Sequence, residues 1–519
     1  MAQSFTDMLR DGYGFTDPSV ILGAAVDGQH TYPEPKIKIP LGMMNRHGLI
    51  AGATGTGKTK TLQFLAEQLS AAGVPVFAAD IKGDLSGIAV PGEANDKIAA
   101  RAKDVGYDWK PKGIPTEFVS LSGKLGVQLR ATVSSFGPIL LAKVLSLNET
   151  QSSVLAMVFK YADDKGLPLL DLPDLRALLQ FLTSDEGKPE LAQYGGMSTA
   201  SVGVLLRSMV ELETQGADQF FGEPEFDVKE CLQTTSDGRG VVTCLELADV
   251  QDKPKLYSTF LMWLLAELYH NLPEAGDLPR PKLVFFFDEA HLLFDDASKA
   301  FLEQVEQVVR LIRSKGVGVY FVTQTPKDVP DSVLAQLGNR VQHALRAHTP
   351  NDEAALRATV RTFPKTGFYD LEETLTSLGI GEAVVTALDP RGVPTPVVAA
   401  RFIPPESRMG PLTPDELQAD VRQSPLLATY GKAVDRESAR EMLAKRMQQT
   451  EPAGDGAGGG TAQPAKSGRA AKTIAQVAGG ALVGALTSSF GRTVGREVVR
   501  GIFGMLGAKP SSGSRRSRW

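Results

Sequence analysis

Eight consecutive residues near the start of the chain have the types and spacing of a phosphate-binding loop. The pattern GxxxxGK(S/T) is met in full by Gly52, Ala53, Thr54, Gly55, Thr56, Gly57, Lys58 and Thr59. Glycines let backbone N–H groups turn inward around phosphates, and a following helix adds the positive end of its dipole. We therefore expect Lys58 to reach the β- and γ-phosphates of ATP and Thr59 to offer its hydroxyl to Mg²⁺. A chance glycine-rich turn is the alternative, which the strand and helix expected on either side disfavour.

Two adjacent carboxylates, Asp288 and Glu289, follow the apolar run Leu283–Phe287. A buried strand of an open α/β sheet presents its last residues at the edge where ligands bind. We expect Asp288 to hold the hydration shell of Mg²⁺ and Glu289 to polarise the attacking water. The alternative is an ordinary strand that ends in solvent-exposed acids.

The acidic pair also indicates which class of phosphate-binding protein the sequence fits. A small GTPase orients its water with a glutamine, and a metabolite kinase must keep water away from the phosphate, so hydrolysis coupled to work fits better. No LSGGQ-type signature precedes the acidic strand, which disfavours a transporter subunit of the ABC class. The run Val317–Thr323 ends beside Gln324, which we assign as a sensor of the γ-phosphate or of the water. A simple hydrogen bond at the strand end is the competing interpretation.

An amphipathic helix is expected between these two strands, from the spacing of its apolar residues. Arg310, Arg313 and Lys315 are crowded at its C-terminal end before Gly316. These cations either complement the helix dipole or include an arginine finger that reaches the γ-phosphate bound by a neighbouring subunit. The spacing alone leaves both roles open.

The elements that must position these residues are those of a doubly wound α/β protein. Strand-like runs rich in β-branched and aromatic residues alternate with helical patterns, which is typical of parallel strands buried on both faces. The expected strands are His47–Ala51, Val74–Ala79, Glu117–Leu121, Val241–Leu245, Leu283–Phe287 and Val317–Thr323, and the helix after the loop is Thr59–Ala72.

The helical patterns also indicate how the chain is divided. Residues 41–135 and 236–405 are expected to form the α/β core, with an all-α insertion over 136–235. A hairpin is expected from Ala383–Leu388 and Val397–Arg401. The remaining segments are a weakly patterned lead-in (1–40), a charged helical extension (406–450), a Gly/Ala/Pro linker (451–472) and a basic, Gly-rich C-terminal segment (473–519).

Charge and composition restrict the binding partners and the compartment that the sequence favours. The 519 residues carry a net charge of −5, yet residues 466–519 hold ten Lys and Arg against the single acid Glu497. An acidic body argues against nonspecific nucleic-acid binding over the whole surface, but not against a basic channel or tail. For the tail we weigh a helix packed on a ring or neighbour, a membrane-surface contact and a contact with nucleic acid; a membrane span is disfavoured. Two cysteines, neither in a CxxC pair, and no visible secretory signal indicate the cytosol.

Taken together and in this order, the motifs resemble the HerA/FtsK branch of P-loop motor ATPases, and among them bacterial HerA-like proteins. The resemblance covers almost the whole chain through HGLIAGATGTGKTKTLQFLAEQL, ADIKGDLSG, SSFGPILLAKVLSLNETQ, FFFDEAHLLF, RLIRSKGVGVYFVTQTPKDVP, IPPESRMGP and GREVVRGIFGMLG. It implies a RecA-like core, a homo-hexameric ring and ATP hydrolysed at subunit interfaces. Arg313 resembles the finger position of this branch, and Arg46 resembles a second basic position that acts across the interface.

One departure from archaeal HerA proteins affects the partner. Those proteins begin with a β-barrel domain, whereas a short lead-in precedes the loop here, so docking of a nuclease through a barrel does not carry over. A nuclease or another protein stays open as a partner. The leading hypothesis is a ring ATPase that translocates on or remodels DNA. The alternatives are an ATPase that drives protein or secretion-coupled remodelling, and a nucleotide-controlled scaffold.

Overall fold

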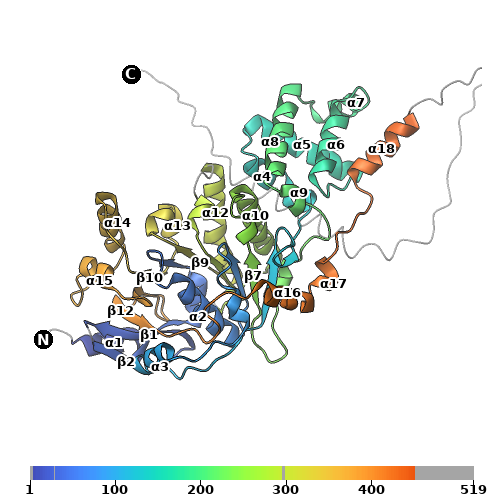
Figure 1. Cartoon of the computed structure of the whole chain (residues 1–519). Helices are drawn as coiled ribbons and strands as arrows, with labels where there is room; N and C mark the ends of the chain where they lie inside the picture. The colour runs from blue at the N-terminus through green and yellow to red at the C-terminus, as the bar shows by residue number, and fades with distance from the viewer. Residues whose placement is uncertain (1–3, 29, 277, 295–298, 451–519) are drawn as a thin grey trace, which may run out of the picture. The chain divides into compact units, whose positions relative to one another are not determined.

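The computed structural model describes residues 4–28, 30–276, 278–294 and 299–450 (Figure 1). The described residues up to Leu443 form one compact unit, which ends before Ala444. The expected linker and basic C-terminal segment lie outside the described residues, so the three interpretations of the tail stay predictions. Among the described helices, none combines the length and apolar character that crossing a membrane requires.

A twelve-stranded sheet is the framework of this unit, with the order β2-β1-β12-β11-β10-β3-β9-β8-β4-β7-β5-β6. From β10 to β6 all neighbouring strands are parallel, and from β10 to β2 they are antiparallel. The parallel strands are β3 (Gly48–Ala51), β4 (Val76–Asp80), β5 (Thr116–Ser120), β6 (Val127–Gln128), β7 (Val242–Glu246), β8 (Leu283–Phe287), β9 (Val317–Thr323) and β10 (Asn339–His343). The doubly wound α/β core is therefore confirmed.

Register brings the C-terminal ends of the central strands to one edge of the sheet. Ala51 of β3 is paired with Thr323 of β9, and Asp80 of β4 is paired with Glu246 of β7. Because parallel strands end at a common edge, the loop after β3 and the acids after β4, β7 and β8 must meet there.

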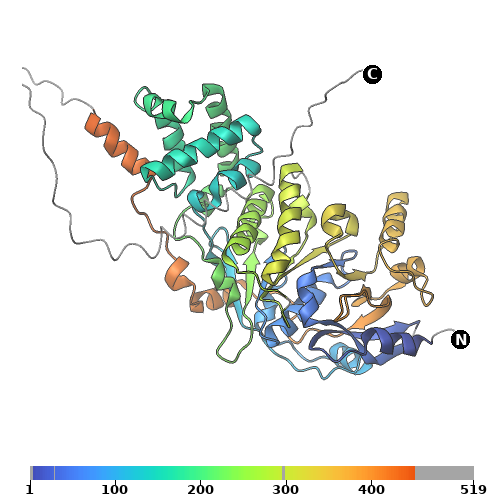
Figure 2. The same cartoon turned by 180° about the vertical axis from the view of Figure 1, so that it is seen from behind.

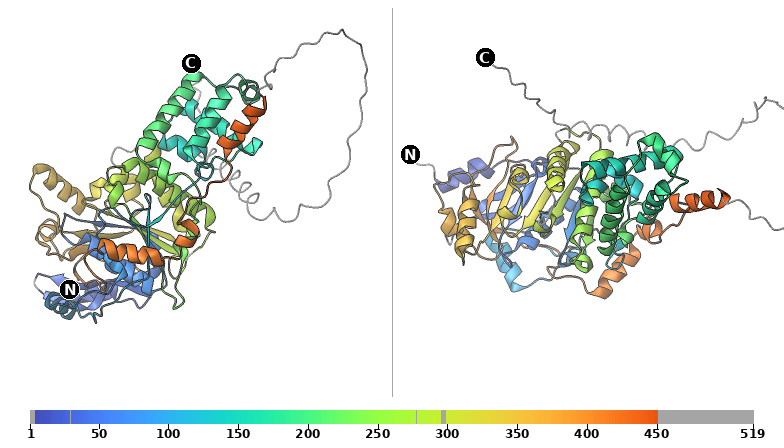
Figure 3. Two further views of the ribbon diagram at one scale, coloured as in Figure 1. Left: turned by 45° about the vertical axis from the view of Figure 1, so that its right-hand side comes forward. Right: turned by 90° about the horizontal axis from the view of Figure 1, so that it is seen from above.

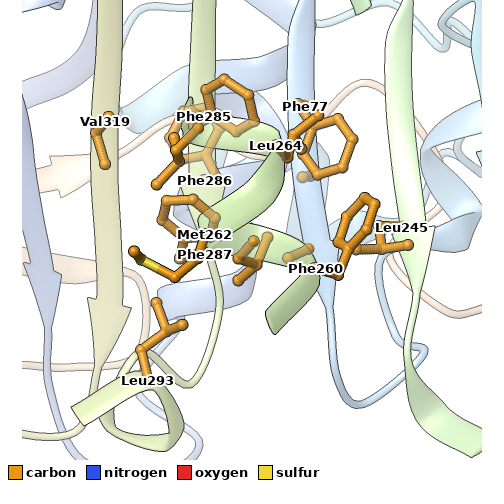
Figure 4. Packing of buried hydrophobic residues seen from close by; sticks show 14 of the residues in the cluster. Phe77, Leu245, Phe260, Met262, Leu264, Phe285, Phe286, Phe287, Leu293 and Val319 are labelled. Carbon is orange, nitrogen blue, oxygen red and sulfur yellow. The ribbon is translucent and has the colours of Figure 1, made fainter. Parts of the chain in front are cut away.

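Apolar side chains fill both faces of this sheet. Every residue of β8 is buried, and the rings of Phe77 and Phe285 lie 5.0 Å apart. Figure 4 shows these rings next to Phe260 and Leu264 of α10 (Pro254–Asn271), which covers that face of β4 and β8. The core therefore holds the strands that carry the acids in fixed register.

Helices supply the other layers and the insertion. The helix after the loop is α2 (Lys58–Ala71), and α12 (Lys299–Ile312) with the turn η6 (Arg313–Lys315) joins β8 to β9. Between β6 and β7 the chain is helical, as expected, and Figures 1 and 3 show this group beside the β7 side of the sheet. Its longer helices are α4 (Val133–Val144), α5 (Glu149–Lys165), α6 (Leu172–Thr183) and α8 (Thr199–Thr214).

The structure gives the lead-in and the helical extension in more detail than the sequence patterns do. The lead-in is structured: α1 (Phe5–Tyr13) precedes β1 (Ser19–Asp27) and β2 (His30–Pro40), which extend the sheet past the hairpin of β11 (Glu382–Thr386) and β12 (Val398–Phe402), as the view from behind in Figure 2 also shows. The helical extension consists of three helices, which Ser424–Pro425 and Gly431 separate: α16 (Pro414–Gln423), α17 (Leu427–Tyr430) and α18 (Ala439–Thr450).

Candidate nucleotide-binding and hydrolysis site

The loop between β3 and α2 is anchored on both sides by neighbouring strands. The Gly52 N–H donates to the carbonyls of Thr323 and Gln324 at 3.2 and 3.1 Å, and the Ala53 N–H donates to Ala344 at 2.9 Å. The loop is thus fixed between the ends of β9 and β10. The N-terminus of α2 follows directly, which is the arrangement expected for a phosphate cradle.

Glycine is required in this loop for two different reasons. Gly57 has a φ of 115°, which disfavours other residues, and a Cβ there would lie 3.2 Å from the Gly381 nitrogen. A Cβ at Gly52 would lie only 2.5 Å from the Cβ of His343. The pattern of glycines therefore reflects close backbone packing as well as the turn.

Lys58 begins α2 and turns back across the loop. Its buried ammonium donates to the carbonyls of Gly52 at 2.8 Å and Ala53 at 3.3 Å. Burial lowers the pKa of Lys58, while the charges of Glu289 and Asp288 oppose that shift. The lysine and the acidic pair therefore share one site, as the sequence predicts. Thr59 lies half-buried in the same first turn of α2.

The acidic pair follows β8 in a constrained turn. Glu289 has a φ of 46°, and its N–H donates to Asp288 Oδ1 at 2.9 Å. Burial, together with the charges of Asp80 and Glu289, raises the pKa of Asp288 to about 7. Burial would also raise the pKa of Glu289, but the hydrogen bond and charge of Lys82, with Lys58 and His291, hold it below its ordinary value. Glu289 is thus kept ionised at neutral pH.

Three further acids that the sequence interpretation missed join this edge. Carboxylate oxygens of Asp80, Asp84 and Asp288 lie within 4.8 Å of one another, and Glu246 lies next to Asp80. Burial and the charge of Asp80 raise the pKa of Glu246 to about 8. Within the described part of the chain, Asp84 Oδ1 is buried without a hydrogen-bond partner. Carboxylates with free lone pairs suit a hard divalent cation, so the donor set fits Mg²⁺.

A local signal for two of these acids was present in the sequence. Asp80 and Glu246 each end a buried apolar strand, just as Asp288 follows one. The rule that identified Asp288 would have identified them as well. Asp84 and Lys82 lie on the turn after β4. This turn lies beside the end of β8 because β4 and β8 are neighbours in the sheet, and the order of strands cannot be read from a local pattern.

The remaining predicted residues are not all brought together. Gln324 lies at the same edge of the sheet as the loop. Its backbone carbonyl accepts a hydrogen bond from the Gly52 N–H, and the residue is exposed to solvent. Arg313 precedes β9 and Arg46 precedes β3, so both lie at the opposite edge of the sheet. Arg313 is exposed, whereas Arg46 is half-buried beside the buried His47. Neither arginine belongs to the site that this chain's own loop forms.

The sequence is also similar to known proteins. The family described as Helicase HerA-like C-terminal matches residues 27–511. A DNA double-strand break repair helicase HerA of Sulfolobus acidocaldarius is 21% identical over 372 residues, which are 67% of this chain and 64% of the helicase. The chain thus spans less than two thirds of that relative's length.

Solved structures show the same fold. The bacterial conjugative coupling protein TrwB in its unbound form matches with a TM-score of 0.50 at 15% identity, over 77% of this chain and 97% of that chain. TrwB in complex with ADP and Mg²⁺ also gives a TM-score of 0.50 at 15% identity, over 78% of this chain and 98% of that one. At this identity the likeness concerns the fold alone.

Proposed function

The chain belongs to the helicase HerA-like C-terminal family of P-loop ATPases, and from this membership and its nucleotide site we propose that it hydrolyses ATP with Mg²⁺ to move along or remodel DNA. One observation carries the proposal: a phosphate-binding loop and an acidic pair meet at one edge of the sheet, where Lys58 lies in the field of Asp288 and Glu289. A protein that only stored or sensed a nucleotide would have little need for both acids.

The geometry supports roles for the chain's own groups. Lys58 exchanges its two carbonyl contacts for the β- and γ-phosphate oxygens, where a fixed cation stabilises charge that develops during transfer. Glu289 orients the attacking water and accepts its proton, since its lowered pKa keeps it ionised. Gln324 contacts the γ-phosphate or the water from the end of β9. Gly52–Thr59 bind the phosphates through backbone N–H groups.

The metal ion would be held by Thr59 and Asp288, with Asp80 and Asp84 beside Asp288. When bound, Mg²⁺ neutralises part of the phosphate charge. The unpartnered oxygen of Asp84, within the described residues, supports this assignment.

Assembly and substrate are the finer part of the proposal. The relative named as a DNA repair helicase supports DNA as the substrate. Arg313 and Arg46, at the edge away from the loop, fit a homo-hexamer in which each subunit offers them to its neighbour's nucleotide. Both cysteines are buried and free, which fits a cytosolic protein. A nuclease or another protein partner is left open.

An ATPase assay of the full chain with and without single- and double-stranded DNA tests the proposal. We expect Mg²⁺-dependent turnover that DNA stimulates and that Lys58→Ala abolishes. Turnover without any response to DNA would favour protein or secretion-coupled remodelling instead. Near-wild-type turnover by Lys58→Ala would remove the assigned site altogether.

A further inference from the structure

The two oxygens of the Glu289 carboxylate have different surroundings. Oε1 accepts a hydrogen bond from the Lys82 ammonium, and Oε2 lies 3.3 Å from His291 Nδ1. The Glu289 side chain is 5% exposed, whereas that of Lys82 is 43% exposed. A solvent-accessible cation therefore covers the enclosed carboxylate that we assign as the base.

The backbone that carries Lys82 is fixed, but its side chain is not. The Asp80 carboxylate accepts hydrogen bonds from the backbone N–H groups of Lys82, Gly83 and Leu85 at 3.1, 2.8 and 2.8 Å. These three hydrogen bonds fix the turn after β4. Beyond this turn, the Lys82 ammonium reaches across to the Glu289 carboxylate. A four-carbon stem on a rigid turn lets the charge move while its anchor stays in place.

The γ-phosphate is the natural competitor for this ammonium. Lys82 lies close enough to Lys58 to lower the pKa of Lys58, and both cations lower the pKa of Glu289. Since Lys58 marks where the β- and γ-phosphates bind, a triphosphate would place several negative charges within reach of Lys82. A diphosphate would lack the group nearest to Glu289.

We propose that Lys82 is a positioning residue that transfers from Glu289 to the γ-phosphate when ATP binds, and so releases the carboxylate to act on water. This inference rests on the proposed ATP hydrolysis. It gives the site a way to keep its base covered until a nucleoside triphosphate is present. ADP would leave the Lys82–Glu289 pair in place.

The transfer predicts a difference between a triphosphate and a diphosphate. ATP offers a γ-phosphate that can take the Lys82 ammonium from Glu289, and ADP does not. Removing the Lys82 charge should therefore weaken the binding of an ATP analogue and spare the binding of ADP.

Lys82→Met, which removes the charge and keeps the stem, is the test variant. Equilibrium binding should show affinity for a non-hydrolysable ATP analogue falling about tenfold, in line with loss of a charge-assisted hydrogen bond, with ADP affinity unchanged. Lys82→Arg should restore the preference for the ATP analogue.

Lys160→Met is the matched control, because the Lys160 side chain is also largely exposed and forms an ion pair with a carboxylate, Asp164, within α5 and outside the site. It should leave both affinities unchanged. If Lys82→Met binds the ATP analogue as tightly as the wild type, Lys82 does not reach the γ-phosphate. If Lys82→Met loses affinity for the analogue and for ADP equally, Lys82 does not distinguish the two nucleotides. Either result overturns the transfer.

The outcomes also separate this inference from the function on which it rests. A wild-type chain that neither binds nor hydrolyses ATP would contradict the proposed function. A wild-type chain that hydrolyses ATP while Lys82→Met behaves like it in every measurement would contradict the transfer of Lys82 alone.

Discussion

Replacing the Glu289 carboxylate by an amide separates binding from hydrolysis with the smallest change of shape. In Glu289→Gln the amide oxygen can still accept from Lys82, so the turn and the loop should keep their geometry. The variant loses the base, and general-base contributions are on the order of 10²–10⁴-fold. We expect turnover to fall by that factor while ATP affinity stays within a few-fold, measured by phosphate release and equilibrium binding. An equal loss of ATP affinity would assign Glu289 a structural role.

Glu246 predicts a dependence of stability on pH that opposes the usual one for a carboxylate. Its pKa is about 8 in the folded chain against an ordinary 4.5, so the folded state holds a proton that the unfolded state has lost. Stability should therefore fall as pH rises from about 4.5 to about 8 and level off above that. Glu246→Gln should reduce this slope by the share of Glu246, which is on the order of 3–4 kcal/mol between pH 5 and pH 8. Glu67 and Asp288, whose pKa values burial also raises, should keep their own shares.

Urea unfolding at several pH values, without nucleotide or Mg²⁺, measures this effect. Glu416→Gln is the control, because the Glu416 carboxylate is exposed and its pKa is lowered to about 2 by Arg408. That variant should keep the wild-type slope between pH 5 and 8. An unchanged slope in Glu246→Gln would show that Glu246 is ionised in the folded chain.

How much of the site could be predicted depends on whether its residues are neighbours in sequence. The loop and the pair Asp288–Glu289 are contiguous motifs, so residue types and spacing sufficed. Lys82 and Asp84 reach the site because β4 pairs directly with β8 although about 200 residues separate them in the chain. No local pattern encodes that pairing.

At the scale of elements, the segment 403–412 ties the helix of the phosphate loop to the turn after β4. Glu67 of α2 accepts the N–H groups of Glu406 at 2.9 Å and Ser407 at 3.0 Å. Further along, the Arg408 N–H donates to Val90 and the Leu412 N–H to Ser86 Oγ, both at 3.0 Å. The segment therefore links Lys58 and Lys82 through their supporting elements.

Glu67→Ala should loosen this link. It leaves two backbone N–H groups and the Ser407 hydroxyl without their acceptor, and each unsatisfied buried group costs about 1–3 kcal/mol. We expect lower stability in denaturant and faster amide exchange over 403–412. Arg408→Ala is the control: it breaks an exposed ion pair with Glu416, worth about 0–1 kcal/mol. Equal effects of the two variants would contradict the linking role.

Strands with a strong buried pattern were predicted closely, and those without one were missed. Leu283–Phe287 and Val317–Thr323 have the predicted bounds, because each is apolar and enclosed on both faces. β2 contains three prolines and charged residues, as an edge strand tolerates. β10 has the polar sequence NRVQH and is stabilised by its neighbours β3 and β11. Only the tertiary pairing makes these segments strands.

At the scale of the whole molecule, the position of Arg313 determines whether it can act on this chain's own nucleotide or only on that of a neighbouring subunit. β9 is seven residues long, so Arg313, which precedes it, is roughly 20 Å from the edge where ATP is expected to bind. A finger at this position can act only on a neighbour's nucleotide. Arg313→Ala should then keep ATP binding and ring formation but lower turnover by about 10³–10⁵-fold. Arg310→Ala, which removes an exposed arginine just before Arg313, is the control and should retain turnover.

Mixing two inactive variants tests the interface directly. A ring assembled from Arg313→Ala and Lys58→Ala subunits contains some interfaces with an intact phosphate loop on one side and an intact Arg313 on the other. Those interfaces should recover partial turnover, and wild-type activity should rise cooperatively with protein concentration. If Arg313 only complements the helix dipole, its loss should cost about 0.3–1 kcal/mol of stability and spare turnover. Full activity from a monodisperse monomer would contradict both the finger and the ring, because no arginine at the far edge of the sheet can then serve the loop.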